Sequence, residues 1–262
     1  MSNITQAIWV ELQKMRRSKM PLLNALGFSF APLAGGFFMI VLKDPDLARQ
    51  LGMISTKAQI VAGSADWETY LGLLGQATAI GGIMVFGLIG SWVFGREYSD
   101  HTIKDLLALP TPRSAIVLAK FVVVALWSAA LIVIIYLIGL GVGFAVRLPP
   151  VPIEIFWQGT ITLAITACLT IALVTPIAFA ASAGHGYLAP MGVAILALVF
   201  GQVVAATGWG EYFPWSIPAL RAGMAGEQCA NLGIISYVIV ILTSFAGMIG
   251  TFLWWELADQ KH

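Results

Sequence analysis

Seven charged side chains gather in one short segment of a chain that otherwise carries little charge. They are Arg96, Glu97, Asp100, Lys104, Asp105, Arg113 and Lys120, and all lie in the stretch FGREYSDHTIKDLLALPTPRSAIVLAK, residues 94–120. Of the whole chain, 59% is hydrophobic and only 10% is charged. Charges of mixed sign can pair with those of another protein, and such pairs mainly set the orientation and rate of association. The first chemistry that the sequence indicates is therefore recognition of a partner.

Catalytic chemistry has little support in the sequence. Ser182 and His185 are close enough to suggest a serine protease within the membrane, but the glycine pattern of a nucleophile elbow and a third orienting group are absent. No His-Glu-x-x-His motif is present, so a metal hydrolase is not indicated. A phosphate-binding loop needs a Gly-Lys dipeptide, and the chain has none. We therefore expect no metal and no cofactor in this chain.

The elements that must position the charged segment are membrane-spanning helices. A helix needs roughly 20 apolar residues to cross a bilayer core about 30 Å thick. Six segments meet that requirement, so we expect one all-helical transmembrane domain over residues 1–262. The expected spans cover approximately residues 21–42, 70–94, 114–146, 155–181, 187–206 and 232–255. No charged residue is expected deep in any span, which disfavours a carrier coupled to protons or ions.

Basic residues in the flanks of the spans predict the orientation, because Lys and Arg concentrate on the cytoplasmic side. With a cytoplasmic N-terminus, nine of the 14 basic residues lie inside the cell. These nine are Lys14, Arg16, Arg17, Lys19, Arg96, Lys104, Arg113, Lys120 and Lys261. We therefore expect both termini and the charged segment to be cytoplasmic.

Residues 1–20 are predicted to form an amphipathic helix along the inner leaflet. Apolar residues recur at helical spacing on one side and charged residues occupy the other, as an interfacial helix requires. The apolar set is Ile4, Ile8, Leu12 and Met15, and the charged set is Glu11, Lys14 and Arg17. The alternative is a solvated basic flank. A cleaved signal peptide is disfavoured because the apolar run that follows is too long for a signal core.

The charged segment also carries the signals of a short helix between the second and third spans. Thr102 followed by Asp105 fits a capping box, and Ile103, Leu106 and Leu107 form an apolar stripe of one turn. Pro110 ends this pattern. We expect a short amphipathic helix over residues 102–109, with its charges toward the cytoplasm and its leucines toward the spans.

The order of residues in this segment resembles the cytoplasmic loop of type-2 ATP-binding-cassette (ABC) permeases. The residues that carry the resemblance are Gly95, Arg96, Glu97, Thr102, Leu106, Leu107, Pro110, Arg113 and Lys120. An E-x-x-K-x-R-R helix before the first of six spans and the segment YFPWSIP, residues 212–218, extend it. In layout the chain is most similar to the small permeases of bacitracin and lantibiotic resistance.

The resemblance implies that the short helix is a coupling helix that inserts into a cleft on a separate ATPase subunit. The residues expected at this contact are Arg96, Glu97, Asp100, Thr102, Lys104, Asp105, Pro110 and Arg113. The alternative is that Arg96 and Glu97 only pair with each other, as exposed ion pairs commonly do for under about 1 kcal/mol. His185, in the turn between the fourth and fifth spans, is expected to be a second ATPase contact or a solvated turn residue.

The resemblance also implies where a substrate would pass. Helices in the positions of spans two and five line the central cavity of such permeases, so the path is expected beside Gln76, Met84, Phe86 and Gln202. Such a cavity suits an amphiphilic small molecule, a peptide antibiotic or a lipid. The alternative for the glutamines is that they join neighbouring helices to one another.

The function implied by the resemblance is the membrane subunit of an ATP-driven exporter in a prokaryotic cell membrane. ATP and Mg would be bound by the partner ATPase, and a second permease chain would complete the path. A net charge of +1 gives no support for a nucleic-acid partner. Two alternatives stay open: a channel or scaffold that does not use ATP, and a haem-handling or cytochrome-assembly protein. The latter is suggested by the aromatic residues of 209–215, although aromatic residues are usual at a membrane interface.

Overall fold

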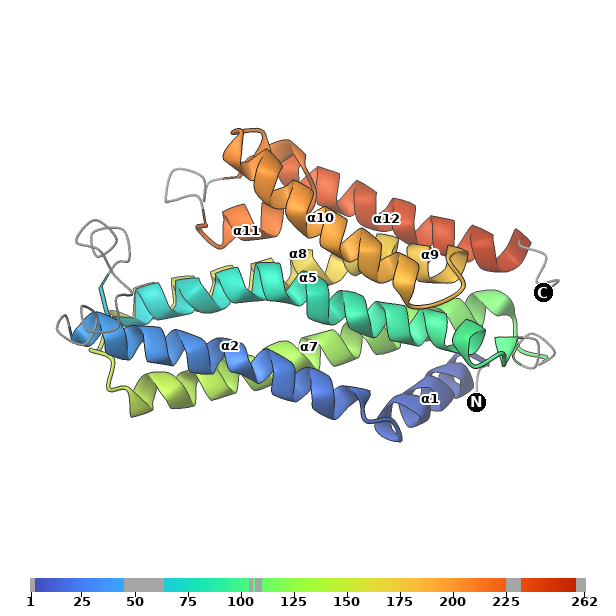
Figure 1. Cartoon of the computed structure of the whole chain (residues 1–262), viewed down its shortest axis with the longest axis horizontal. Coiled ribbons are helices and arrows are strands. Elements are labelled where there is room, and N and C mark those ends of the chain that lie inside the picture. Colours follow the sequence, from blue (N-terminus) through green and yellow to red (C-terminus); the bar gives the residue numbers. More distant parts are fainter. Residues whose placement is uncertain (1–2, 45–63, 104–105, 107–109, 225–231, 258–262) are drawn as a thin grey trace.

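The computed structural model describes residues 3–44, 64–103, 106, 110–224 and 232–257, and every regular element among them is a helix (Figure 1). Six helical segments are long and apolar enough to cross a membrane, which confirms the predicted number of spans. They are α2 (Met20–Lys43), α5 (Trp67–Ser99), α7 (Arg113–Ala145), α8 with α9 (Ile153–Ala172 and Val174–Ala183), α10 (Leu188–Ala206) and α12 (Ile234–Leu257). The shorter elements are α1 (Asn3–Arg16), η1 (Gly210–Tyr212) and α11 (Ile217–Arg221).

Helix α5 runs through the middle of the bundle. In Figure 1, α5 and α8 lie between α2 and α7 on one side and α10 and α12 on the other. In its most apolar window, 61% of α5 is buried, against 22% in both α10 and α12. Glycines allow neighbours to approach it closely, because a Cβ at Gly90 would lie 2.7 Å from Val174 Cγ1.

The bounds of α5 differ from the sequence prediction at its carboxyl end. The span was expected to end at Phe94, but the helix continues to Ser99. Arg96 and Glu97 therefore lie on the last turns of a helix and not in a loop. At the other end, the Asp66 carboxylate accepts the Thr69 N–H at 2.9 Å and caps the helix.

The fourth span is broken into α8 and α9 at Leu173, just before Pro176. The Ala172 carbonyl next to the break accepts the Thr175 hydroxyl at 3.1 Å and the Ser244 hydroxyl at 2.7 Å. Helix α12 comes close enough to supply Ser244 because Gly247 has no side chain: a Cβ there would lie 2.4 Å from Pro176 N. One hydroxyl of α9 and one of the neighbouring helix α12 thus satisfy a backbone group that the break releases.

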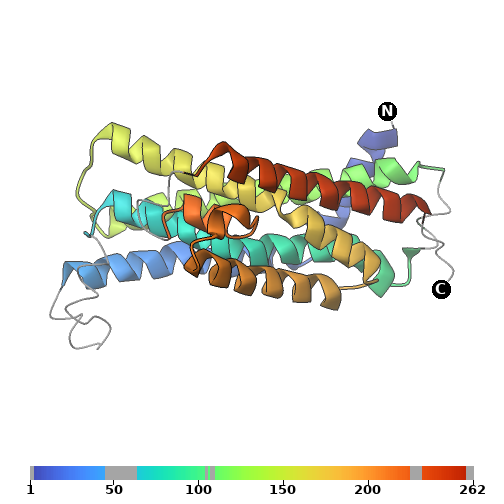
Figure 2. The same cartoon turned by 90° about the horizontal axis from the view of Figure 1, so that it is seen from above.

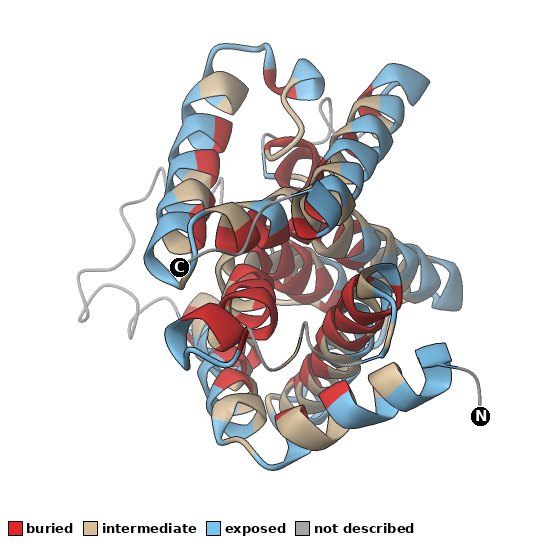
Figure 3. Cartoon of the chain, turned by 90° about the vertical axis from the view of Figure 1, so that its right-hand side faces the viewer, coloured by how far each residue is buried: buried red, intermediate tan, exposed pale blue. Residues whose placement is uncertain are grey.

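Both ends of the chain lie at the same end of the bundle (Figures 1 and 2). We call it the charged end, and it comprises α1, the last turns of α5, residues 100–103, 106 and 110–113, the turn 184–187 and the last turn of α12. Figure 3 views the bundle from this end and shows α1 lying across it rather than along the spans, with buried residues concentrated in the middle of the bundle.

Candidate functional site

The carboxyl end of α5 is closed by a Schellman motif that sets the direction of the chain after the helix. His101 has a positive φ of 57°, and its N–H donates to the Tyr98 carbonyl at 3.3 Å. The Thr102 N–H donates to the Glu97 carbonyl at 2.9 Å. The turn at residues 100–102 is thus fixed to the backbone of α5, and Asp100, His101 and Thr102 are exposed on it.

Only part of the predicted coupling helix is described. Ile103 and Leu106 have helical conformation, and the Leu106 N–H donates to the Thr102 carbonyl at 3.1 Å. Ile103 is 7% exposed and packs into the core, while Leu106 is half-buried against it. Lys104 and Asp105 lie outside the described residues, so the rest of the helix over 102–109 stays a prediction.

Four charged side chains from three helices meet inside the charged end, and we call them the buried charge cluster. They are Glu11 and Lys14 from α1, Glu97 from α5 and Lys120 from α7. Glu97 Oε1 lies 2.8 Å from Lys120 Nζ and 3.0 Å from Lys14 Nζ. Glu11 lies 2.7 Å from Lys14 Nζ and 3.4 Å from Lys120 Nζ. Opposite charges therefore alternate around a closed ring.

Pairing explains why charges can be buried here. Lys120 is 0% exposed and Glu97 is 2% exposed, and side chains of these types are almost never fully buried unless they are paired. Lys120 Nζ also donates to the Val93 carbonyl at 2.7 Å. For Lys14, burial alone would lower the pKa, but the carboxylates of Glu11 and Glu97 outweigh burial and raise the pKa, so the ammonium stays charged.

The cluster corrects two expectations from the sequence. Glu97 is too buried to touch another protein in this structure, so its expected direct contact with an ATPase does not hold here. Glu11 does not lie on the solvent side of α1 but is buried, as is Met15. Lys120 and Glu97 are buried together near one end of the helices that form spans two and three, and not deep within them.

Arg96 forms the expected ion pair with Glu97, but this is the longest of the ion-pair contacts around that carboxylate. Arg96 Nη2 lies 3.9 Å from Glu97 Oε1, and its guanidinium stacks 4.8 Å from the centre of the Trp92 ring. The alternative that Arg96 and Glu97 pair only with each other is therefore wrong, since both lysines of the cluster lie closer to Glu97.

The other residues of the expected contact lie on or near the surface of the charged end. Asp100, Thr102 and Pro110 are exposed. Arg113 is half-buried, and its guanidinium donates to the Trp255 and Glu256 carbonyls at 3.1 and 3.4 Å. Arg113 thus joins the first turn of α7 to the last turn of α12 as well as facing the surface.

His185 lies in an exposed turn that packs on the end of α5. Its ring centre is 4.9 Å from that of Tyr98 and 6.0 Å from that of Trp254. Gly95 allows the approach, because a Cβ there would lie 2.8 Å from the Gly186 carbonyl oxygen. The turn 184–187 therefore shares one surface with the turn at residues 100–102.

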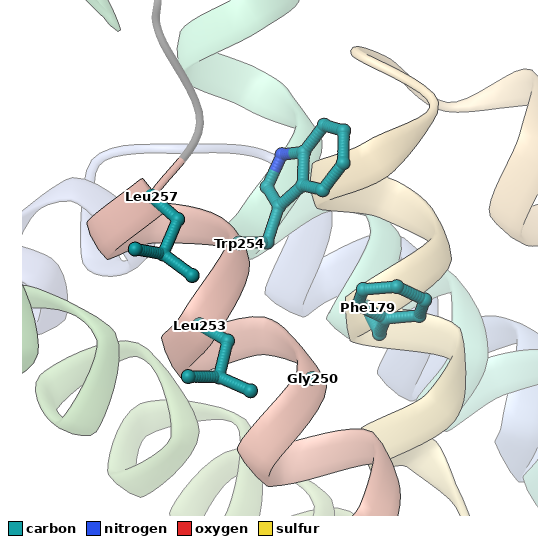
Figure 4. A pocket seen from close by; sticks show the side chains of 5 residues that line it. All are labelled: Phe179, Gly250, Leu253, Trp254 and Leu257. Atoms are coloured by element: carbon teal, nitrogen blue, oxygen red, sulfur yellow. The ribbon is translucent and has the colours of Figure 1, made fainter.

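An apolar pocket of about 450 Å³ lies between α9 and α12 beside this surface. Figure 4 shows Phe179 of α9 facing Gly250, Leu253, Trp254 and Leu257 of α12 across it. Every residue that lines the pocket is apolar or aromatic, as is usual for a helix surface in contact with lipid.

The residues expected along a substrate path do not all lie together. Gln76 and Met84 line an open groove of about 500 Å³ between α2 and α5. Gln202 lines a second groove of about 240 Å³ between α10 and α11, and Met224 borders both grooves. Phe86 is different, because it is fully buried and packs edge-to-face on Phe28 with ring centres 5.6 Å apart. It belongs to the core, so its expected place on the path does not hold within this chain.

Lys14 and Lys120 were not recognised from the sequence as partners of Glu97, and Glu11 was not recognised as the second acid of the cluster. Glu97 and Lys120 are 23 residues apart and Glu11 and Lys120 are 109 apart, so no local pattern connects them. The available signal was Lys120 itself, a lysine placed after the predicted start of an apolar span, where an ionisable side chain needs a partner.

Comparison with known families identifies the chain. The family described as "ABC-2 family transporter protein" matches residues 7–201, which include most of α1, the whole of α5 and the charged segment. The chain belongs to this family. A relative is the bacitracin transport permease protein BCRB of Bacillus licheniformis, which is 25% identical over 179 residues, covering 68% of this chain and 85% of the relative. The chain is thus a multi-pass permease subunit of an ABC transporter and not itself the catalytic subunit.

Proposed function

We propose that this permease is driven by a separate ATPase subunit that docks on the turn at residues 100–102. The observation that carries the proposal is the fixation of this turn: the Schellman motif holds it to α5, and the next residue, Ile103, is buried in the core. Exposed Asp100 and Thr102 are therefore presented in one defined position. A push on such a turn moves α5, which is the most buried span of the bundle.

The surface of contact would include Lys104, Asp105 and Pro110 on the same segment, with Arg96 and Arg113 at its margins. His185 supplies a second contact, because its turn rests on the end of α5. Glu97 acts from inside by holding the end of α5 and does not touch the partner. ATP and Mg are bound by the ATPase, and this chain contributes no cofactor site.

The charged end would face the cytoplasm, with both termini on that side of a prokaryotic cell membrane. Arg16, Arg17 and Lys19 support this orientation, because they flank α2 at the charged end and basic residues favour the cytoplasmic side. The ATPase, which needs cellular ATP, would then meet the exposed turn directly.

Two permease chains, identical or related, would form the translocation path. Both grooves are open to the outside of the single chain, and Met224 connects them, so a second chain laid over this face would enclose them. The lining is mostly apolar with Gln76 and Gln202 as polar groups, which suits an amphiphilic substrate. The name of the Bacillus relative indicates a peptide antibiotic, and a substrate of that kind or a lipid fits the lining. Closure of the ATPase pair would move the turn and rock the two halves between inward and outward openings, as export requires.

The test is to express the permease with the ATPase encoded beside it and to measure co-purification for matched variants. Asp100→Arg and Thr102→Ala change the proposed contact, whereas Glu211→Ala removes an exposed acid in η1, away from the charged end. We expect the ATPase to co-purify with the unaltered chain and with Glu211→Ala, and to be lost or reduced with the first two variants. An ATPase that binds all four proteins equally would contradict the proposal. Co-purification of no ATPase with the unaltered chain would favour a channel or scaffold that does not use ATP.

A further inference from the structure

Charged side chains connect helix α1 to the end of α5. The helix packs mainly along α7, and Lys14 reaches Glu97 in the last turns of α5. Glu11 reaches Lys120, which in turn holds both the Val93 carbonyl and the carboxylate of Glu97. The helix that lies across the charged end is therefore joined to α5 by the buried charge cluster.

We propose that Glu11 and Lys14 are positioning residues that make α1 part of the coupling apparatus. They tie the end of α5, and with it the exposed turn at residues 100–102, to α1 and α7, so that the turn cannot move by itself. A push on the turn is then carried into the spans and is not absorbed by fraying of the last turns of α5. This inference rests on the proposed function, because it assumes that an ATPase pushes there.

The closed ring of charges is what makes the connection stiff. Each member contacts two members of opposite sign, at 2.7, 2.8, 3.0 and 3.4 Å around the ring. A shift of α1 relative to α5 lengthens at least two of these contacts together. Three of the four side chains are at most 7% exposed, so water is not at hand to replace a lost partner.

The exposed side of α1 is suited to a second attachment, to the surface of the membrane. Trp9 is 54% exposed and Val10 is 48% exposed, and Arg16 is exposed on the same helix. An aromatic and an aliphatic side chain beside a basic residue suit the interface of a membrane, where the ring lies among the headgroups. Helix α1 is therefore held by the spans on one side and suited to the bilayer surface on the other.

The decisive variant exchanges the two charges of α1. Glu11→Lys with Lys14→Glu keeps the net charge and the pair three residues apart, but places a lysine against Lys120 and a glutamate against Glu97. The matched control, Asn3→Lys with Gln6→Glu, adds a lysine and a glutamate with the same spacing at two exposed positions of α1 and also keeps the net charge. Lys14→Arg keeps the sign of the charge and serves as the conservative variant.

The readout is motion of the spans in response to ATP, which does not depend on knowing the substrate. In a background of Cys168→Ser and Cys229→Ser, a single reporter, Gln76→Cys, is placed in the groove between α2 and α5. The permease with its bound ATPase is reconstituted in lipid nanodiscs. The rate of labelling by a fluorescent maleimide and the rate of ATP hydrolysis are measured with and without ATP and Mg.

We expect ATP to change the labelling rate in the unaltered chain, in the matched control and in Lys14→Arg. In the exchanged variant, ATP hydrolysis should continue while the ATP-dependent change in labelling falls by roughly tenfold, the size expected when one hydrogen bond to a charged group is lost. If the exchanged variant binds its ATPase and responds to ATP like the unaltered chain, α1 has no positioning role and the inference is overturned. If the unaltered chain itself shows no response to ATP, the proposed function fails and this inference fails with it.

Discussion

The two ends of the bundle are held together by different kinds of contact. At the charged end, α1, α5 and α7 meet through a ring of buried ion pairs. At the opposite end, Trp67 packs edge-to-face against Tyr70, Phe144 and Phe156, with ring centres 5.1 to 6.1 Å apart. A charged side chain also contacts α7 at this end, but at the surface. Lys43 Nζ donates to the Val146 and Arg147 carbonyls, just after α7, at 2.7 and 2.6 Å.

The difference matters because the two contacts respond differently to movement. Aromatic packing supplies buried area and tolerates small shifts of one ring along another. A buried ion pair stabilises little beyond an apolar core of the same shape, but breaking it is severe because a charge is left without a partner. The charged end is therefore suited to transmit a displacement, because its helices resist shifting relative to one another. The opposite end is suited to hold the helices together while it tolerates small shifts between them.

The largest effect is expected when the cluster loses one charge. Lys120→Met leaves Glu97 buried without its closest cation, and we expect a loss of about 3–5 kcal/mol of stability. The measurement is thermal unfolding of the detergent-solubilised protein. The control is the double variant Lys120→Met with Glu97→Gln, which also removes the carboxylate that has lost its closest cation and should recover most of the loss. If Lys120→Met were as stable as the double variant, Lys120 and Glu97 would not form a charged contact.

A somewhat smaller effect is expected at the opposite end. Trp67→Ala removes the ring that Phe144 and Phe156 pack against, and deletion of a buried aromatic side chain destabilises by about 3 kcal/mol. Because this end is held by aromatic packing and not by ion pairs, the ATP-dependent change in labelling should persist in the fraction of Trp67→Ala protein that folds. Loss of that response in a folded Trp67→Ala protein would remove the contrast between the two ends.

The packing of the His185 turn on α5 is tested by a single methyl group. Gly95→Ala would place a Cβ 2.8 Å from the Gly186 carbonyl oxygen, so the turn must shift away from α5. Overpacking of this kind destabilises by about 2 kcal/mol. Gly27→Ala on α2 is the matched control, because a Cβ there meets nothing within 4 Å. Equal unfolding temperatures for both variants would mean that the turn is not held against α5.

The smallest effect is expected at the start of α5. Asp66→Ala removes the carboxylate that accepts the Thr69 N–H, and loss of such a cap destabilises by about 1 kcal/mol. Asp66→Asn keeps an acceptor and should be close to the unaltered protein in thermal unfolding. If Asp66→Asn lost as much stability as Asp66→Ala, the charge of Asp66 and not its hydrogen bond to Thr69 would be responsible.

The six spans could be predicted because lipid demands long runs without charge, and the sequence shows those runs directly. The extent of α5 could not, since hydropathy marks where charge begins, at Arg96 and Glu97, and does not record that the helix continues to Ser99. The buried charge cluster could not be predicted either, because Glu11 and Lys120 meet only when α1 folds across the end of the bundle. The buried place of Phe86 likewise depends on Phe28 of a different span.

The most direct test of the account is a photo-crosslink from the exposed turn. A photoreactive amino acid at Asp100 is compared with the same residue at Glu211, in cells that make the permease with its ATPase. The account predicts a crosslink to the ATPase from position 100 and none from position 211. Crosslinking from position 211 alone, or from neither position while the two proteins still co-purify, would contradict docking at the charged end.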